Sequence, residues 1–210
     1  MTEFNTSQLK TETFTFTPEH ASRAQAIIAK YPVGWQASAV QPLLDLAQRQ
    51  NGGFINHAII DYVAEMLQMP KIRVYEVATF FTMYNHEPIG KHHVQVCTNL
   101  PCWLRGSDQI MSVCEKFLDT QPNQTSKDGM FTITEVECLG ACVNAPMMQI
   151  DDDYYEDLDE SSTLDILSAL KMGKQPKTGS QIRRFSCEPI TGLTSLENQE
   201  KLRQAKLGKR

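Results

Sequence analysis

The sequence has no long apolar run and no secretory start. Its 210 residues contain no stretch of about 18 consecutive apolar residues that could cross a bilayer. Residues 1–12 lack the basic start and apolar core of a signal peptide, and the Arg-rich, acid-poor composition of a transit peptide is also missing. We therefore expect a bacterial or mature organellar chain that is not exported and that meets a membrane only through partners.

Nucleotide-binding motifs are missing as well. No Gly-x-Gly-x-x-Gly follows a strand pattern, and the sequence has no Walker loop. If the protein takes part in nicotinamide chemistry, the dinucleotide must bind to another chain.

Charge is divided unevenly along the chain. Residues 1–170 hold 10 Lys and Arg against 22 Asp and Glu, a net charge of -12, whereas residues 171–210 hold 10 against 3, a net charge of +7. Phe185 is the one aromatic residue in this basic tail, and the acidic body would repel phosphate, so nucleic-acid binding is not expected. The tail is expected to bind a partner protein or the acidic face of its own chain.

Residues 18–88 carry the apolar periodicity of several helices. The first helix is expected to start at Thr17, a good N-cap before Pro18 at the first helical position. The second is expected to start at Ser38, which has capping-box spacing to Gln41. This part of the chain is therefore predicted to be a small helical bundle.

Beyond Gly90 the pattern changes to the period of two that is typical of strands. Strands are expected over 92–97, 131–138 and 147–150, and helices from Ser107 and over 162–172, the latter capped by Ser161 or Ser162. This order of elements is that of a compact α/β unit. From Gly173 onward Pro, Gly, Lys and Arg dominate, which predicts an extended arm.

Four of the six cysteines form two pairs, Cys97 with Cys102 and Cys138 with Cys142. Each pair follows a predicted strand, so strand ends lying side by side would bring the four thiols to one edge of the sheet. Cluster irons and Zn²⁺ both accept four thiolates. Structural zinc commonly uses closer Cys-x2-Cys spacing, so the wider loops favour a [2Fe-2S] cluster, with zinc or four incidental thiols as the alternatives.

The remaining candidates have simpler interpretations. Disulfides are not expected in an unexported chain, so Cys114 is interpreted as a core thiol and Cys187 as a spare thiol of the arm. No histidine lies between or after the cysteine pairs, which argues against Rieske ligation. Trp103 is expected to shield the metal site from water, and the acidic run 151–160 to be a solvated turn and not a calcium loop.

Four runs of sequence are recognisable: VYEVATFFTMYN at 74–85, VCTNLPCWLRGS at 96–107, EVECLGACVNAP at 135–146 and YEDL at 155–158. They closely resemble the E subunit of bacterial NADH-quinone oxidoreductases, the counterpart of the small flavoprotein-fragment subunit of mitochondrial respiratory complex I. The resemblance implies an α/β (α+β) fold with an N-terminal helical bundle, a thioredoxin-like [2Fe-2S] ferredoxin domain and an extended C-terminal arm. With the patterns above, it divides the chain into a flexible N-terminus at 1–17, a helical region at 18–88, the thioredoxin-like domain at 89–172 and the basic arm at 173–210.

The resemblance also implies a function. One [2Fe-2S] cluster would be held by Cys97, Cys102, Cys138 and Cys142, and would exchange single electrons with FMN. FMN and NADH would bind to a partner flavoprotein subunit, and a further iron-sulfur subunit would belong to the same complex. The chain would have no activity of its own, and would lie peripherally on the cytoplasmic side of the bacterial inner membrane, or on the matrix side in an organelle. The alternative is the equivalent diaphorase-type subunit of an NAD-linked hydrogenase or formate dehydrogenase.

Overall fold

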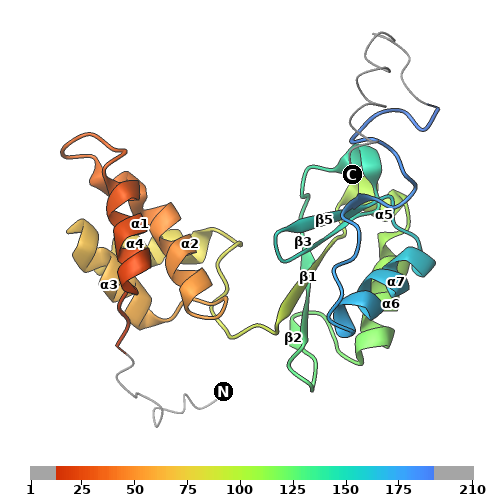
Figure 1. Cartoon of the computed structure of the whole chain (residues 1–210), viewed down its shortest axis with the longest axis horizontal. Coiled ribbons are helices and arrows are strands. Elements are labelled where there is room, and N and C mark those ends of the chain that lie inside the picture. The colour runs from red at the N-terminus through yellow and green to blue at the C-terminus, as the bar shows by residue number, and fades with distance from the viewer. Residues whose placement is uncertain (1–12, 192–210) are drawn as a thin grey trace. The chain divides into compact units, whose positions relative to one another are not determined.

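A computed structural model describes residues 13–191. The predicted flexible N-terminus is therefore described only over 13–17, and the predicted arm only over 173–191. The chain forms two compact units, Met1–Ile89 and Gly90–Arg210 (Figure 1). Among the described helices, none combines the length and the apolar character needed to cross a bilayer.

The first unit is a helical bundle, as the sequence predicts. Its elements are α1 (Pro18–Ile28), the 3-10 helix η2 (Gln36–Ala39), α2 (Val40–Gln50), α3 (His57–Leu67) and α4 (Lys71–Phe80). The Thr17 side chain caps α1 by accepting a hydrogen bond from the backbone N-H of His20. The predicted cap at Ser38 is wrong: this residue lies in the 3-10 turn, and α2 begins at Val40 without a side-chain cap.

The core of this unit comes from the predicted apolar stripes. Leu43, Leu44, Ile59, Val63 and Val74 are fully buried and belong to one apolar cluster. These five side chains come from α2, α3 and α4. Contacts between the helices, and not a side-chain cap at Ser38, therefore fix where α2 begins.

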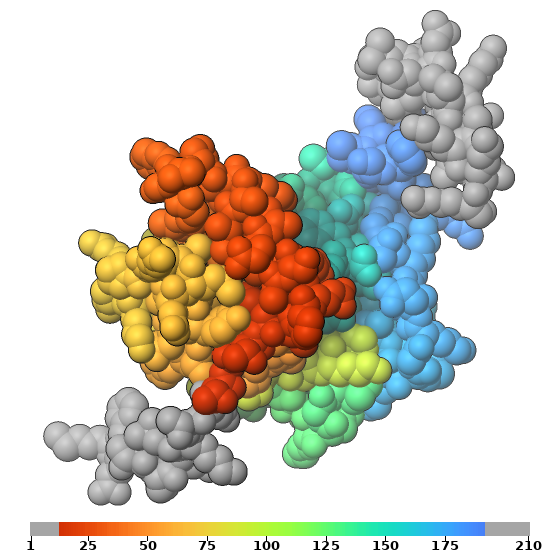
Figure 2. Space-filling view, turned by 60° about the vertical axis from the view of Figure 1, so that its left-hand side comes forward, coloured from red at the N-terminus to blue at the C-terminus, as the bar shows by residue number. Residues whose placement is uncertain are grey.

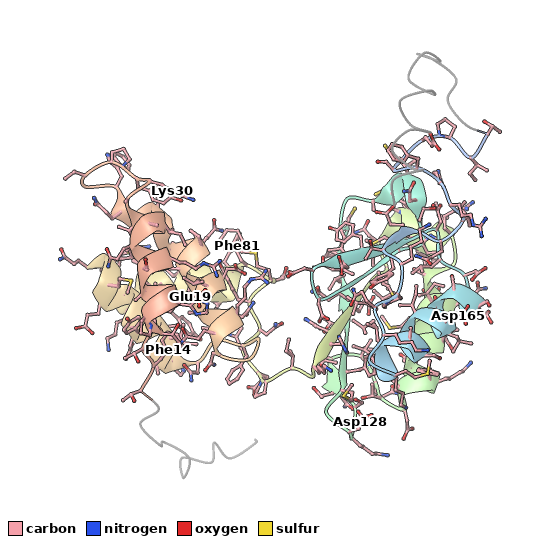
Figure 3. The ribbon with its side chains drawn as sticks, in the orientation of Figure 1. Phe14, Glu19, Lys30, Phe81, Asp128 and Asp165 are labelled. Atoms are coloured by element: carbon pink, nitrogen blue, oxygen red, sulfur yellow. The ribbon has the colours of Figure 1, made fainter. Side chains whose placement is uncertain are left out.

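Aromatic contacts extend this core to the ends of the unit. Phe14, labelled in Figure 3, meets Tyr62 edge to face with ring centroids 5.5 Å apart. At the other end Tyr84 is 3% exposed, and its hydroxyl donates to the carbonyl of Gln41 at 2.9 Å. The helical unit therefore has a complete core of its own.

The second unit is built on a six-stranded sheet with the order β2-β3-β1-β4-β5-β6. The strands are β1 (His92–Cys97), β2 (Gln124–Thr125), β3 (Phe131–Val136), β4 (Met148–Ile150), β5 (Asp153–Glu156) and β6 (Gly179–Ser180). The helices are α5 (Leu100–Leu104), α6 (Ser107–Leu118), η3 (Cys142–Asn144) and α7 (Glu160–Lys171). Helices α6 and α7 lie side by side and pack beside the sheet (Figure 1).

The sheet combines both strand directions. β1 pairs in parallel with β3, with Cys97 opposite Val136, and pairs antiparallel with β4. Because parallel neighbours end at the same edge, the segments that follow β1 and β3 start side by side. The buried core beneath includes Phe131 and Ile133 of β3 together with Cys114 of α6.

Two sequence expectations about this unit need correction. The acidic run 151–160 is not simply a solvated turn, because Asp153–Glu156 form β5 and Tyr155 is only 1% exposed. The last helix starts at Glu160 and is capped by Asp159, while Ser162 is the third residue of a capping box. The described part of the predicted extended arm adds a strand to the sheet, since its residues 179–180 form β6 beside β5.

Replacing Asp159 by alanine is expected to lower the free energy of unfolding by about 1 kcal/mol, because the cap of α7 is lost. The carboxylate accepts from the backbone N-H of Ser162 at 2.7 Å and from its hydroxyl at 2.7 Å, and these bonds hold the pKa of Asp159 below its usual value. The stabilisation is therefore present above the unfolded-state pKa and is lost as the pH falls through the folded-state pKa.

Urea denaturation of the Asp159→Ala chain at neutral and acidic pH measures this effect. Asp165→Ala is the matched control, since Asp165 is exposed on the same helix (Figure 3). A loss of stability that does not shrink in acid would contradict the capping role.

Candidate metal centre

The first cysteine pair is set by the end of β1. Cys97 is the last residue of the strand, and the next residue, Thr98, donates its backbone N-H to the carbonyl of Val136 at 3.3 Å. Cys102 lies on the short helix α5, whose first residue is capped by the Asn99 side chain at 2.9 Å. Both thiols are buried, with Cys97 2% and Cys102 1% exposed. The sequence placed Cys102 in a loop, but a helix turn fixes it.

The second cysteine pair lies in a tight loop after β3. Cys138 and Cys142 are exposed, and their sulfurs lie 3.3 Å apart. The loop turns at Gly140, whose φ of +86° is a left-handed conformation that glycine adopts without strain. There the Gly140 backbone N-H points at the Cys138 sulfur, 3.4 Å away.

Two side-chain hydrogen bonds connect the first ligand loop to the end of β3, which leads into the second ligand loop. The Thr98 hydroxyl donates to the Glu135 carboxylate at 2.6 Å, and the Asn99 amide donates to the Glu137 carboxylate at 2.6 Å. No sequence pattern indicated these four residues as part of the site. Their position in the sequence was the usable signal. Thr98 and Asn99 directly follow Cys97, and Glu135 and Glu137 lie just before Cys138 near the end of β3.

Apolar side chains line the inner side of the site. Cys97 and Cys102 share one buried cluster with Ala145 and Met147, against which Leu139, Ala141 and Tyr154 pack. The Tyr154 hydroxyl also donates to the Leu139 carbonyl at 2.8 Å, which holds the second loop against β5. Trp103, which is expected to shield the site from water, is 54% exposed, and its indole N-H donates to Asp108 at 3.0 Å.

Electrostatic interactions connect the thiols across the two loops. Burial raises the pKa of Cys102 to about 12, helped by the hydrogen bond and charge of Cys97 and by the charge of Cys142. The hydrogen bond with Cys138 raises the pKa of Cys142, to which burial and the charges of Cys138 and Cys97 add. By contrast, the Gly140 N-H, followed by the bond from Cys142, lowers the pKa of Cys138. The four thiols therefore lie close enough to one another that each thiolate makes it harder for the next thiol to lose its proton.

Such a site needs positive charge to ionise fully, and a metal centre provides it. Within residues 13–191, no group of three or more His, Cys, Asp or Glu side chains has an arrangement that could hold a metal ion. The thiols are instead arranged as two pairs, one on each loop. Four sulfur donors in two pairs fit a two-iron cluster in which each loop holds one iron.

The other two cysteines differ from these four. Cys114 is 0% exposed inside the apolar cluster of the sheet unit, and burial raises its pKa to about 12, which confirms a core thiol. Cys187 is exposed in the described part of the arm.

Comparison with known proteins identifies the family. The family model of the thioredoxin-like [2Fe-2S] ferredoxins matches residues 24–171. The chain belongs to this family. The E subunit of the NADH-quinone oxidoreductase of Rickettsia prowazekii is 60% identical to this family member over 149 residues, which cover 71% of the chain and 84% of the relative. NADH dehydrogenase [ubiquinone] flavoprotein 2, mitochondrial, of Dictyostelium discoideum is 49% identical over 183 residues, which cover 87% and 74%.

These relatives confirm the resemblance that the four sequence runs indicate. Among solved structures, a chain of an NAD+-reducing [NiFe]-hydrogenase matches with a TM-score of 0.53 and 14% identity, over 62% of this ferredoxin-family chain and 23% of the hydrogenase chain. At that identity the match shows a shared fold only.

Proposed function

We propose that the chain is an electron-transfer subunit of an NADH-quinone oxidoreductase. Cys97, Cys102, Cys138 and Cys142 hold one [2Fe-2S] cluster, and single electrons pass between this site and FMN in a partner subunit that also binds NADH. The observation that carries the proposal is the convergence of two thiol pairs on loops that start side by side at one edge of the sheet. Relatives at 49% and 60% identity named as subunits of this enzyme support the assignment.

The chemistry of the donor set fits this role. When bound, an all-thiolate [2Fe-2S] cluster accepts and returns one electron at low potential. The chain's own residues prepare the site: Gly140 directs its N-H at the Cys138 sulfur, and the apolar side chains around Cys97 and Cys102 exclude water from the inner side. Hydride transfer belongs to the partner, because the sequence has no dinucleotide-binding motif.

The surface around the thiols suits a protein partner. Large apolar side chains are exposed on both ligand loops, namely Leu100 (61%), Trp103 (54%), Leu104 (69%) and Val143 (65%). Clustered apolar exposure of this kind indicates a contact surface. We infer that the FMN-binding flavoprotein subunit covers it, which would bring the flavin within electron-transfer distance of the two exposed thiols.

The assembly and location follow from the same proposal. A further iron-sulfur subunit belongs to the complex, and the chain reaches the membrane only through its partners. It is peripheral on the cytoplasmic side of the inner membrane, or on the matrix side in an organelle. The hydrogenase match does not favour the alternative host enzyme, since it is a likeness of fold.

Metal analysis and EPR of the anaerobically purified chain test the proposal. We expect a red-brown protein with about two irons and about two sulfides per chain and an EPR signal after dithionite reduction. A colourless protein that contains zinc and gives no EPR signal would contradict the cluster. Co-purification from the native host tests the complex, and recovery with hydrogenase subunits would contradict the choice of host enzyme.

A further inference from the structure

The C-terminal arm is bonded directly to the loop that carries Cys142. Asn144, at the end of η3, is 3% exposed. Its amide nitrogen donates to the Glu156 carboxylate at 2.6 Å and to the Ser186 carbonyl at 2.9 Å. One buried side chain therefore joins the second ligand loop, β5 and the arm.

A buried ion pair lies beside this junction. The Arg184 guanidinium donates to the Asp157 carboxylate, and the side chains are 7% and 3% exposed. The backbone N-H of Asp157 in turn donates to the Asn144 carbonyl at 2.7 Å. The ion pair joins the arm to an acidic residue of its own chain, and the backbone bond between Asp157 and Asn144 connects it to the ligand loop.

Besides Asp157, the Arg184 guanidinium donates to the backbone carbonyl of Glu188, at 3.3 Å. Arg184 Nε and Asp157 Oδ2 are both buried without a hydrogen-bond partner in the part of the chain that the structure describes. Each charge therefore depends on the other, because a buried charge without its partner is strongly unfavourable.

The arm is also held along its length. β6 pairs in parallel with β5, and Gln181 donates its backbone N-H to the Glu156 carbonyl at 3.0 Å. Arg183 and Ser186 have φ values of +65° and +51°, a left-handed conformation that such residues keep only where their surroundings hold them. In Figure 2 the blue surface of the arm adjoins the teal surface of the second ligand loop.

The arm and the loop enclose a cavity of about 1080 Å³. Its lining includes Gly140, Ala141 and Val143 of the loop and Phe185 and Cys187 of the arm. The arm is therefore one wall of the space next to Cys142.

We propose that residues 179–188 are a structural part of the cluster site: they clamp the second ligand loop through Asn144 and the Arg184–Asp157 pair, and so keep the cluster in the chain. This inference rests on the proposed function for the cluster itself. It assigns Arg184 and Asn144 as positioning residues.

The test uses full-length variants with a matched control. Arg184→Met removes the buried charge, and the double variant Asp157→Asn/Arg184→Met removes both charges, which avoids an unpaired carboxylate if the single variant folds poorly. Asn144→Ala breaks the junction from the loop side. Lys174→Met is the control, because Lys174 is an exposed basic residue of the same arm that lies outside residues 179–188 and outside the lining of the cavity.

Two measurements are made on each variant: hydrogen exchange of the backbone amides of residues 139–145 in the chain without cluster, and the rate at which a chelator bleaches the loaded chain. We expect exchange to accelerate and bleaching to become about 10- to 100-fold faster in the Arg184 and Asn144 variants, with the Lys174 control unchanged.

The outcomes separate this inference from the proposed function. Unchanged exchange in the double variant overturns the clamp whether or not a cluster binds. Faster exchange with unchanged bleaching also overturns it, because the arm would then not retain the cluster. A wild-type chain that never acquires iron and sulfide removes the proposed function and this inference together, whereas normal loading in all variants with wild-type bleaching removes the inference alone.

Discussion

The Cys102→Ala chain is expected to purify colourless, without the iron, sulfide and EPR signal of the wild type. The thiol of Cys102 is 1% exposed on α5 and interacts with Cys97 in its own loop and with Cys142 in the other. Removing it leaves three sulfurs for a cluster that needs four ligands. Cys114 cannot replace it without rearrangement, since Cys114 lies in a different core cluster. Iron and sulfide analysis with visible absorbance measures the loss.

Cys114→Ala is a closely matched control for this experiment. It removes the same sulfur from a side chain that is 0% exposed, so the packing cost is similar, about 1 to 2 kcal/mol. We expect this variant to keep its full iron content and EPR signal while its free energy of unfolding falls by that amount. Equal cluster loss in both variants would show that burial, not ligation, explains the Cys102 result.

Leu43→Ala is expected to lower the free energy of unfolding of the helical unit by about 2 to 5 kcal/mol. Leu43 lies on α2, is 0% exposed and belongs to the core shared by α2, α3 and α4. Truncation leaves a cavity that rigid helix packing fills only in part. Urea denaturation followed by far-UV circular dichroism measures the change.

The control for this substitution is Ile72→Ala on α4 of the same bundle. Ile72 is 60% exposed, so we expect the free energy of unfolding of the Ile72→Ala variant to stay within about 0.5 kcal/mol of the wild-type value. The cores of the two units contain separate residues, so Leu43→Ala in the absence of denaturant should keep the visible absorbance of the cluster. Loss of the visible absorbance in a variant that keeps its full helical circular dichroism signal would contradict the independence of the two cores.

The sequence predicted that each thiol pair follows a strand, because the signal for that position lies in the residues next to each pair. Cys97 and Cys138 follow short alternating apolar runs, and two such strands paired in parallel must end at one edge. The helical bundle was equally predictable, since its apolar stripes recur at helical spacing over α2 and α3.

Short helices and strands were not predicted where their sequence pattern is weak or mixed. Helix α5 has five residues, too few for periodicity, although Asn99 before Leu100 and Pro101 was a usable start signal. In β5 the acidic residues on either side of Tyr154 and Tyr155 concealed a strand of four residues, which is too short to show an alternating pattern.

The contacts of the arm could not have been predicted from the sequence. Asn144 bonds to partners 12 and 42 residues away, and Arg184 to an aspartate 27 residues away. A buried amide or ion pair leaves no periodic pattern, because its partners are set by the folded sheet and not by neighbours in the chain. The basic charge of the arm gave only the general expectation of an acidic contact.

The pairing of β1 with β3 has a consequence for how the protein is made. During synthesis Cys97 and Cys102 leave the ribosome first, and 35 residues that include α6 and β2 lie between Cys102 and Cys138. The parallel strands can pair only after this whole crossover has been translated. Iron donors in the cell therefore meet a complete set of sulfurs only after residue 142 has been translated, so the first ligand loop alone cannot receive the cofactor during the synthesis of this subunit.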